Sequence, residues 1–71
     1  MLIIVHTNSD TLTFLSYEEV VEKLKSPNIS ASDKEMIAQK ASDLLTVSNM
    51  DHDKIEYYKN IFAYYIQPIV Y

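Results

Sequence analysis

The sequence predicts a small α+β domain in which an N-terminal β-hairpin is followed by three α-helices, in the order ββααα. Three observations predict this fold. The first fifteen residues contain two short apolar segments on either side of a turn. Two Ser-x-x-Glu sequences mark the starts of helices. The last third of the chain repeats apolar and aromatic residues at helical spacing.

The first two elements are predicted strands that form a hairpin. Leu2–His6 is an apolar, β-branched run, and Thr11–Leu15 alternates polar and apolar residues with Leu12 and Phe14 on one face. The intervening Thr7–Asp10 segment is rich in turn residues. Its Asn and Asp residues can take the left-handed conformation that glycine would otherwise supply. Because an isolated hairpin is only marginally stable, either the helices cover it or a second copy extends its sheet.

The first helix is predicted over residues 17–26. It starts with a capping box, in which the Ser16 hydroxyl accepts from the amide of Glu19 and the Glu19 carboxylate accepts from the amide of Ser16. Pro27 ends it, because the α region is disfavoured for the residue before a proline. The residues expected on its inner face are Tyr17, Val20, Val21 and Leu24.

Two further helices are predicted over residues 33–47 and 51–67. A second capping box, which begins at Ser32, marks the start of the former. Asn49 or Asp51 starts the latter, and carboxylates in this region suit the positive end of the helix dipole.

The helix over residues 51–67, which Pro68 is expected to end or kink, carries more apolar and aromatic surface than one-sided packing needs. Five of the six tyrosines lie in the last fifteen residues of the chain. One arc, an ordinary core face, holds Ile55, Tyr58, Phe62, Tyr65, Ile66 and Ile69. An adjoining arc holds Tyr57, Ile61 and Tyr64.

Two interpretations of this helix remain open. It is either the central helix, packed on two sides by the rest of the domain, or its second arc contacts a partner, which is another copy or a different protein. Exposed aromatic residues with polar groups are typical of protein interfaces. The residues predicted to form such an interface are Tyr57, Tyr58, Ile61, Tyr64, Tyr65 and Tyr71.

Size and composition exclude several classes of protein. The 71 residues allow a single domain, residues 1–71, with one small core. Without cysteine there is no thiolate metal site, and without glycine no glycine-built phosphate cradle. The net charge of −4 and the lack of arginine predict no direct nucleic-acid binding and no membrane binding. The sequence has no targeting or membrane-spanning pattern, which favours a cytoplasmic location.

The candidate catalytic and metal-binding residues have simpler structural explanations. His6 and His52 are far apart in sequence and form no metal motif. The triplet Asp51–Asp53 could bind a metal, but such clusters more often form helix N-termini. The acidic pattern from Asn49 imitates the start of an EF-hand loop, yet it lacks the glycine and the final glutamate. No Gly-x-Ser-x-Gly nucleophile elbow is present. We therefore expect no enzymatic activity, no metal and no cofactor.

The acidic side chains form clusters that could imitate a row of DNA phosphates. The residues of this predicted acidic surface are Asp10, Glu18, Glu19, Glu22, Asp51, Asp53 and Glu56. A solvated surface is the simpler interpretation, because lysines are interleaved with the acidic residues. A homodimer would double the charge and could align the clusters. The affinity of an acidic mimic for its partner should fall steeply as salt increases.

In size, acidity and lack of catalytic residues, the chain resembles the small inhibitor and adaptor proteins of bacteriophages and mobile elements, although it matches no family motif residue by residue. The leading hypothesis is a non-enzymatic regulator that binds another protein through its tyrosine-rich C-terminal helix and forms a homodimer. The alternative is an acidic DNA mimic that blocks a nucleic-acid-binding protein. A third class, a helix-turn-helix DNA reader, is disfavoured because the last helix offers only Lys54 and Lys59 to phosphates.

Overall fold

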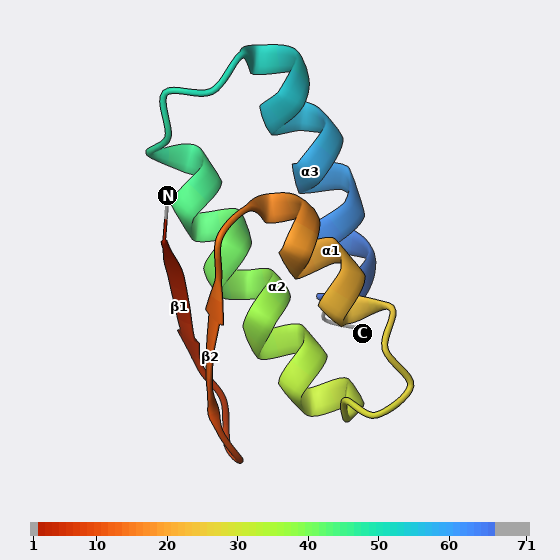
Figure 1. Ribbon diagram of the computed structural model, residues 1–71. Coiled ribbons are helices and arrows are strands. Elements are labelled where there is room, and N and C mark those ends of the chain that lie inside the picture. The colour runs from red at the N-terminus through yellow and green to blue at the C-terminus, as the bar shows by residue number, and fades with distance from the viewer. Residues whose placement is uncertain (1, 67–71) are drawn as a thin grey trace.

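The computed structural model describes residues 2–66 and has the ββααα order that the sequence predicts (Figure 1). Its elements are β1 (Ile3–His6), β2 (Thr11–Phe14), α1 (Tyr17–Leu24), α2 (Ala31–Thr46) and α3 (His52–Tyr65). The two strands pair in an antiparallel sheet, and the helices pack on one of its faces. The predicted α+β fold class is confirmed.

The hairpin is amphipathic because side chains alternate between the two faces of a strand. Ile3 pairs with Phe14, and Val5 pairs with Leu12. Ile3, Val5 and Phe14 are buried, and Leu12 is partly buried against the same core. The intervening Ile4 is exposed on the opposite face. The prediction that Leu12 and Phe14 share one face is therefore confirmed.

Side chains, rather than a left-handed residue, hold the turn between the strands. The amide of Thr7 donates to the carbonyl oxygen of Asp10 at 2.8 Å. The Thr7 hydroxyl oxygen accepts from the amides of Ser9 at 3.3 Å and Asp10 at 3.0 Å. No residue in the described part of the chain has a positive φ. The left-handed conformation that the sequence allows for Asn or Asp is not used in this turn, because the Thr7 hydroxyl satisfies the turn amides without it.

Ser16 caps α1 as predicted, but the Glu19 carboxylate bonds a different amide. The Ser16 hydroxyl accepts from the amide of Glu19 at 3.3 Å. The Glu19 Oε1 atom accepts from the amide of Leu15 at 3.1 Å, one residue before the predicted donor. The helix ends at Leu24 rather than at residue 26, so the chain leaves the helical conformation before it reaches Pro27.

Helix α2 starts at Ala31, two residues earlier than predicted, because Ser30 and not Ser32 is its cap. The Ser30 hydroxyl accepts from the amide of Asp33 at 3.2 Å, which places Asp33 in the first turn near the positive end of the helix dipole. The hydroxyl of Ser9 donates to Asp33 Oδ2 at 2.6 Å. This bond ties the hairpin turn to the start of α2.

Helix α3 starts after Asp51, which stands at the N-cap position without a capping hydrogen bond from its side chain. The helix ends at Tyr65, and Ile66 is extended, with φ −87° and ψ 120°. The observed range is therefore slightly shorter than the predicted residues 51–67. Pro68 and Ile69, to which the sequence assigns a helix stop and a core position, lie outside the described residues.

Helix α2, rather than α3, is the central helix. It contacts β1, α1 and α3, whereas α3 contacts α2 and α1 but neither strand. Figure 1 shows α2 between the hairpin and α3. The fully buried residues of α2 are Ile37, Ala38, Ala41 and Leu45. The interpretation that α3 is packed on two sides at the centre of the domain is wrong for residues 2–66, and one side of α3 stays open.

Candidate interaction surface

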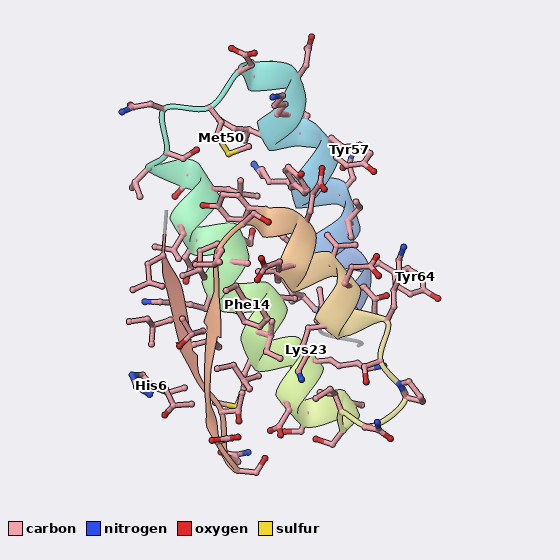
Figure 2. The ribbon with its side chains drawn as sticks, viewed as in Figure 1. His6, Phe14, Lys23, Met50, Tyr57 and Tyr64 are labelled. Carbon is pink, nitrogen blue, oxygen red and sulfur yellow. The ribbon has the colours of Figure 1, made fainter. Side chains whose placement is uncertain are left out.

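The open side of α3 presents two tyrosine rings. The exposed fraction is 62% for Tyr57 and 83% for Tyr64, and Ile61 between them is partly buried against the core. These three residues, which we call the tyrosine face, fall on one side of the helix because residues three and four positions apart are neighbours there. Figure 2 shows both labelled rings projecting away from the sheet. Large aromatic side chains with an exposed hydroxyl are suited to protein contacts.

Tyr58, which the sequence places among the interface residues, is a core residue. Only 9% of it is exposed. Its ring centroid lies 5.6 Å from that of Tyr17 and 6.1 Å from that of Phe62, and the centroids of Tyr17 and Phe62 are 6.2 Å apart. The interface prediction is corrected for Tyr58, because its ring is used in an aromatic cluster that joins α1 to α3.

The two remaining predicted interface tyrosines differ in position. Tyr65 is partly buried against the core, and its ring stands edge-on to that of Tyr64 with centroids 5.2 Å apart. Tyr71 lies outside the described residues. The accessible aromatic surface of the described chain therefore centres on Tyr57 and Tyr64.

Two adjoining hollows bring the acidic residues of α1 to the tyrosine face. One lies between the starts of α1 and α3, with Glu18 on one side and Asp53 on the other. The other runs along α1 past Glu18 and Glu22. Tyr57 and Tyr58 border both hollows. Carboxylates from two helices therefore border the same hollows as the exposed ring of Tyr57.

The phenol groups beside this surface are held in their neutral form. Burial raises the pKa of Tyr58, and the negative charge of Glu18 and the neighbouring Tyr57 raise it further. Burial also raises the pKa of Tyr17. Both phenols are therefore harder to ionise than an exposed tyrosine, and the charge of Glu18 contributes to this only at Tyr58.

Two of the predicted acidic residues bond the backbone and lie away from this surface. Asp10 Oδ1 accepts from the amide of Thr11 at 2.7 Å, in the hairpin turn. Figure 1 shows this turn at the opposite end of β2 from the start of α1, so Asp10 does not join the α1 acidic cluster. Glu19 is bonded to the amide of Leu15, as described above.

The other acidic residues are exposed, and Glu22 forms a weak ion pair in which its Oε2 atom lies 3.7 Å from Lys25 Nζ. Such an exposed pair contributes about 0–1 kcal/mol. Glu56 Oε1 lies 3.7 Å from His52 Nε2. Asp51 and Asp53 lie at the start of α3, where both side chains are exposed.

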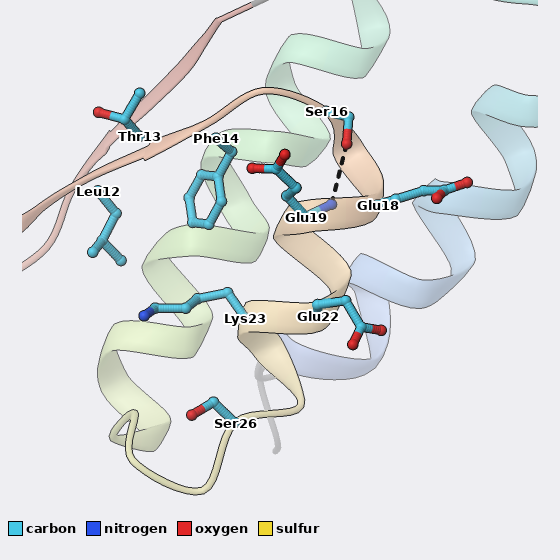
Figure 3. Close-up of a pocket in the computed structure, with 9 residues that line it drawn as sticks. All are labelled: Leu12, Thr13, Phe14, Ser16, Glu18, Glu19, Glu22, Lys23 and Ser26. Atoms are coloured by element: carbon cyan, nitrogen blue, oxygen red, sulfur yellow. Dashed lines mark hydrogen bonds between the residues drawn. The ribbon is translucent and has the colours of Figure 1, made fainter.

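The groove between β2 and α1 has a volume of about 670 Å³. Figure 3 shows Phe14 on its β2 side and Lys23 extending from α1 towards β2. The Ser16 hydroxyl at its end is bonded to the amide of Glu19, and the Glu19 carboxylate is bonded to the amide of Leu15. These groups therefore serve the local structure rather than forming a nucleophile and base pair.

The histidines lie in separate local contacts. His6 Nδ1 is 3.1 Å from the Thr11 hydroxyl, whereas His52 contacts Glu56. Among residues 2–66, His, Cys, Asp and Glu side chains form no group of three or more that could hold a metal ion. None of the described helices has the length and apolar character required to cross a bilayer.

The meeting of Glu18 with Tyr57 is the feature that sequence reasoning missed. The two residues lie in different helices, and only the packing of Tyr17 against the α3 rings brings them together. The one available signal was that Tyr17 is predicted on the inner face of α1, which places Glu18 at its rim. Comparisons of the chain with protein-family models, curated proteins and solved structures found no match.

Proposed function

We propose that this chain is a non-enzymatic regulatory protein of the cytoplasm that binds another protein through the tyrosine face and inhibits or adapts it. The observation that carries this proposal is the exposure of Tyr57 and Tyr64, at 62% and 83%, on a single side of α3. Truncation of central aromatic residues is among the most damaging changes in protein interfaces. An inhibitor or adaptor needs such a surface and no catalytic residues.

The neighbouring carboxylates define the chemistry of the partner. Glu18 and Glu22 lie on α1 beside Tyr57, and Asp53 lies across the hollow on α3. A partner segment with apolar side chains for the rings and Lys or Arg for the carboxylates would match this surface. A guanidinium group could also stack on the exposed ring of Tyr57.

An acidic DNA mimic is the second candidate, and the same juxtaposition supports it. The exposed carboxylates of Glu18, Glu22 and Asp53 border contiguous hollows. Against it, Lys25 and Lys54 border these hollows as well. In this case the partner is a nucleic-acid-binding protein, and the contact is mainly electrostatic.

The test is affinity capture from a lysate of the source cell with three baits. The first is the wild type, the second is Tyr57→Ser with Tyr64→Ser, and the third is Val47→Ser, which changes an exposed apolar residue outside the tyrosine face. We expect the wild type and Val47→Ser to retain the same partner. Each tyrosine substitution should weaken binding by about tenfold if the residue is an interface hot spot.

Repeating the capture at high salt separates the two candidates. A partner held by the tyrosine face is retained, whereas the partner of an acidic mimic is lost, because salt screens exposed charges. Equal capture by all three baits would contradict the proposed role of the tyrosine face. A gel shift with DNA at low salt tests direct DNA binding, and we expect none.

A further inference from the structure

The two outer edges of the hairpin expose different backbone groups. In an antiparallel ladder, residue pairs that exchange hydrogen bonds alternate with pairs whose N–H and C=O groups point outward. The Thr7–Asp10 bond sets this alternation, because that pair continues the register of the strands. The backbone groups of Ile4 and His6 therefore point away from β2, and those of Thr11 and Thr13 point away from β1.

The β2 edge is covered by carboxylates. The outward amide of Thr11 donates to Asp10 at 2.7 Å, and the amide of Leu15, next in the same series, donates to Glu19 at 3.1 Å. The α1 groove runs beside Thr13. An amide that already donates to a side chain is not free to pair with another strand, and charged side chains also protect edge strands from such pairing.

The β1 edge has neither form of protection. Within residues 2–66, the sheet contains only β1 and β2, and no side chain bonds the outward amides of Ile4 and His6. The run Leu2–His6 contains no Lys, Asp, Glu or Pro. Leu2 and Ile4 are 60% and 43% exposed. An apolar edge without Lys, Arg, Asp or Glu favours pairing with another strand.

We propose that this edge pairs with the β1 strand of a second copy, antiparallel about a two-fold axis, to give a four-stranded sheet in the order β2-β1-β1-β2. The occupant is a second copy because the edge is complementary to itself. Each chain offers the N–H and C=O groups of Ile4 and His6, and a two-fold axis brings the donors of one chain to the acceptors of the other.

Charge also favours this edge for contact between copies. Two chains with a net charge of −4 repel each other, and this repulsion is strongest where the acidic α1 surfaces meet. The β1 strand itself contains no Lys, Arg, Asp or Glu. The charged residues that border this edge from α2 are Glu35, Lys40 and Asp43, which include both signs. A wider sheet also adds buried surface to a domain too small to gain much stability from its own core.

This interface differs from the homodimer that the sequence suggests through the C-terminal helix. It uses β1 and leaves Tyr57 and Tyr64 free for a different protein. The two surfaces are therefore separable by mutation.

The test compares Ile4→Pro with Thr13→Pro by sedimentation velocity over a wide range of concentrations. These residues are opposite each other in the register, and both amides point outward, so each proline removes one edge donor and no bond between β1 and β2. We expect the wild type and Thr13→Pro to reach twice the 8.2 kDa of one chain as concentration rises. Ile4→Pro should raise the dimer dissociation constant by at least about tenfold.

A second pair of variants guards against loss of folding. Ile4→Lys places a charge on β1. We expect circular dichroism to show that this variant is folded, and it should be monomeric at concentrations where the wild type is dimeric. Tyr57→Ser with Tyr64→Ser should remain dimeric. A wild type that stays monomeric at every concentration, or a dimer lost through the tyrosine substitutions and kept by Ile4→Lys, would overturn the proposal.

Discussion

Replacement of Phe62 tests the packing that positions the tyrosine face. Phe62 is fully buried, and its ring contacts those of Tyr17 on α1 and Tyr58 on α3. A buried Phe→Ala substitution costs about 3–5 kcal/mol. The core of a domain this small contributes about 3–5 kcal/mol of net stability. Phe62→Ala should therefore be largely unfolded at room temperature, with a loss of helical circular dichroism.

A milder substitution makes this cost measurable. Phe62→Leu keeps most of the apolar volume, which limits the packing cost to about 1.5 kcal/mol or less. It also removes two ring contacts, each contributing about 0.5–1.5 kcal/mol. We therefore expect the free energy of unfolding to fall by about 1–4.5 kcal/mol. In urea titrations the midpoint should decrease while the slope stays constant.

The control is Tyr64→Ala, which changes a residue two positions further along α3 on the exposed side of the helix. Its effect on stability should stay within about 0.5 kcal/mol, as is usual for surface substitutions. If Phe62→Ala destabilised the protein no more than Tyr64→Ala, then α3 would not pack against α1 as described. The assignment of Tyr57 and Tyr64 to one open surface would then be wrong.

Two further predictions concern the helix caps and the buried phenols. Ser16→Ala should lower the free energy of unfolding by about 1 kcal/mol, because it removes the bond to the Glu19 amide, whereas Asp51→Ala should cost less, because Asp51 makes no side-chain capping bond. Urea titration measures both, and equal losses would contradict the difference between the caps. Because burial raises the pKa of Tyr17 and Tyr58 above the ordinary value of 10.0, these phenols should leave stability unaffected below pH 10.0 and reduce it as the pH rises through their folded pKa values. Tyr17→Phe with Tyr58→Phe should flatten this alkaline decline, and an unchanged decline in the double variant would refute the assignment.

Periodicity and capping predict the elements of this fold because both are local properties. The alternation at Leu12 and Phe14 gives the hairpin its buried face, and the Ser16 cap gives the start of α1. Where two residues near a helix start can both act as the cap, the predicted first residue of the helix is wrong by one or two positions. Ser30 and Ser32 can both cap a helix, and only the structure decides for Ser30, which places Asp33 where the Ser9 hydroxyl reaches it.

The arrangement of the helices depends on contacts that the sequence does not encode locally. The width of the apolar arc on α3 indicates how much surface needs a partner, but not which element supplies it. Tyr58 and Phe62 pack against Tyr17, while Tyr57 and Tyr64 stay mostly exposed. The hollow that joins Glu18 to Tyr57 follows from this packing and was therefore not predictable from the two helices taken separately.

The short corner between β2 and α1 limits where the chain can be altered. Only Leu15 and Ser16 separate these elements, and Glu19 is bonded to both residues through its carboxylate and its amide. One inserted residue would lengthen this corner and break the spacing that lets Glu19 bond both Leu15 and Ser16. In the longer connections on either side of α2, residues 25–30 and 47–51, no single residue bonds both neighbouring elements in this way, so epitope tags and fluorescent labels belong there.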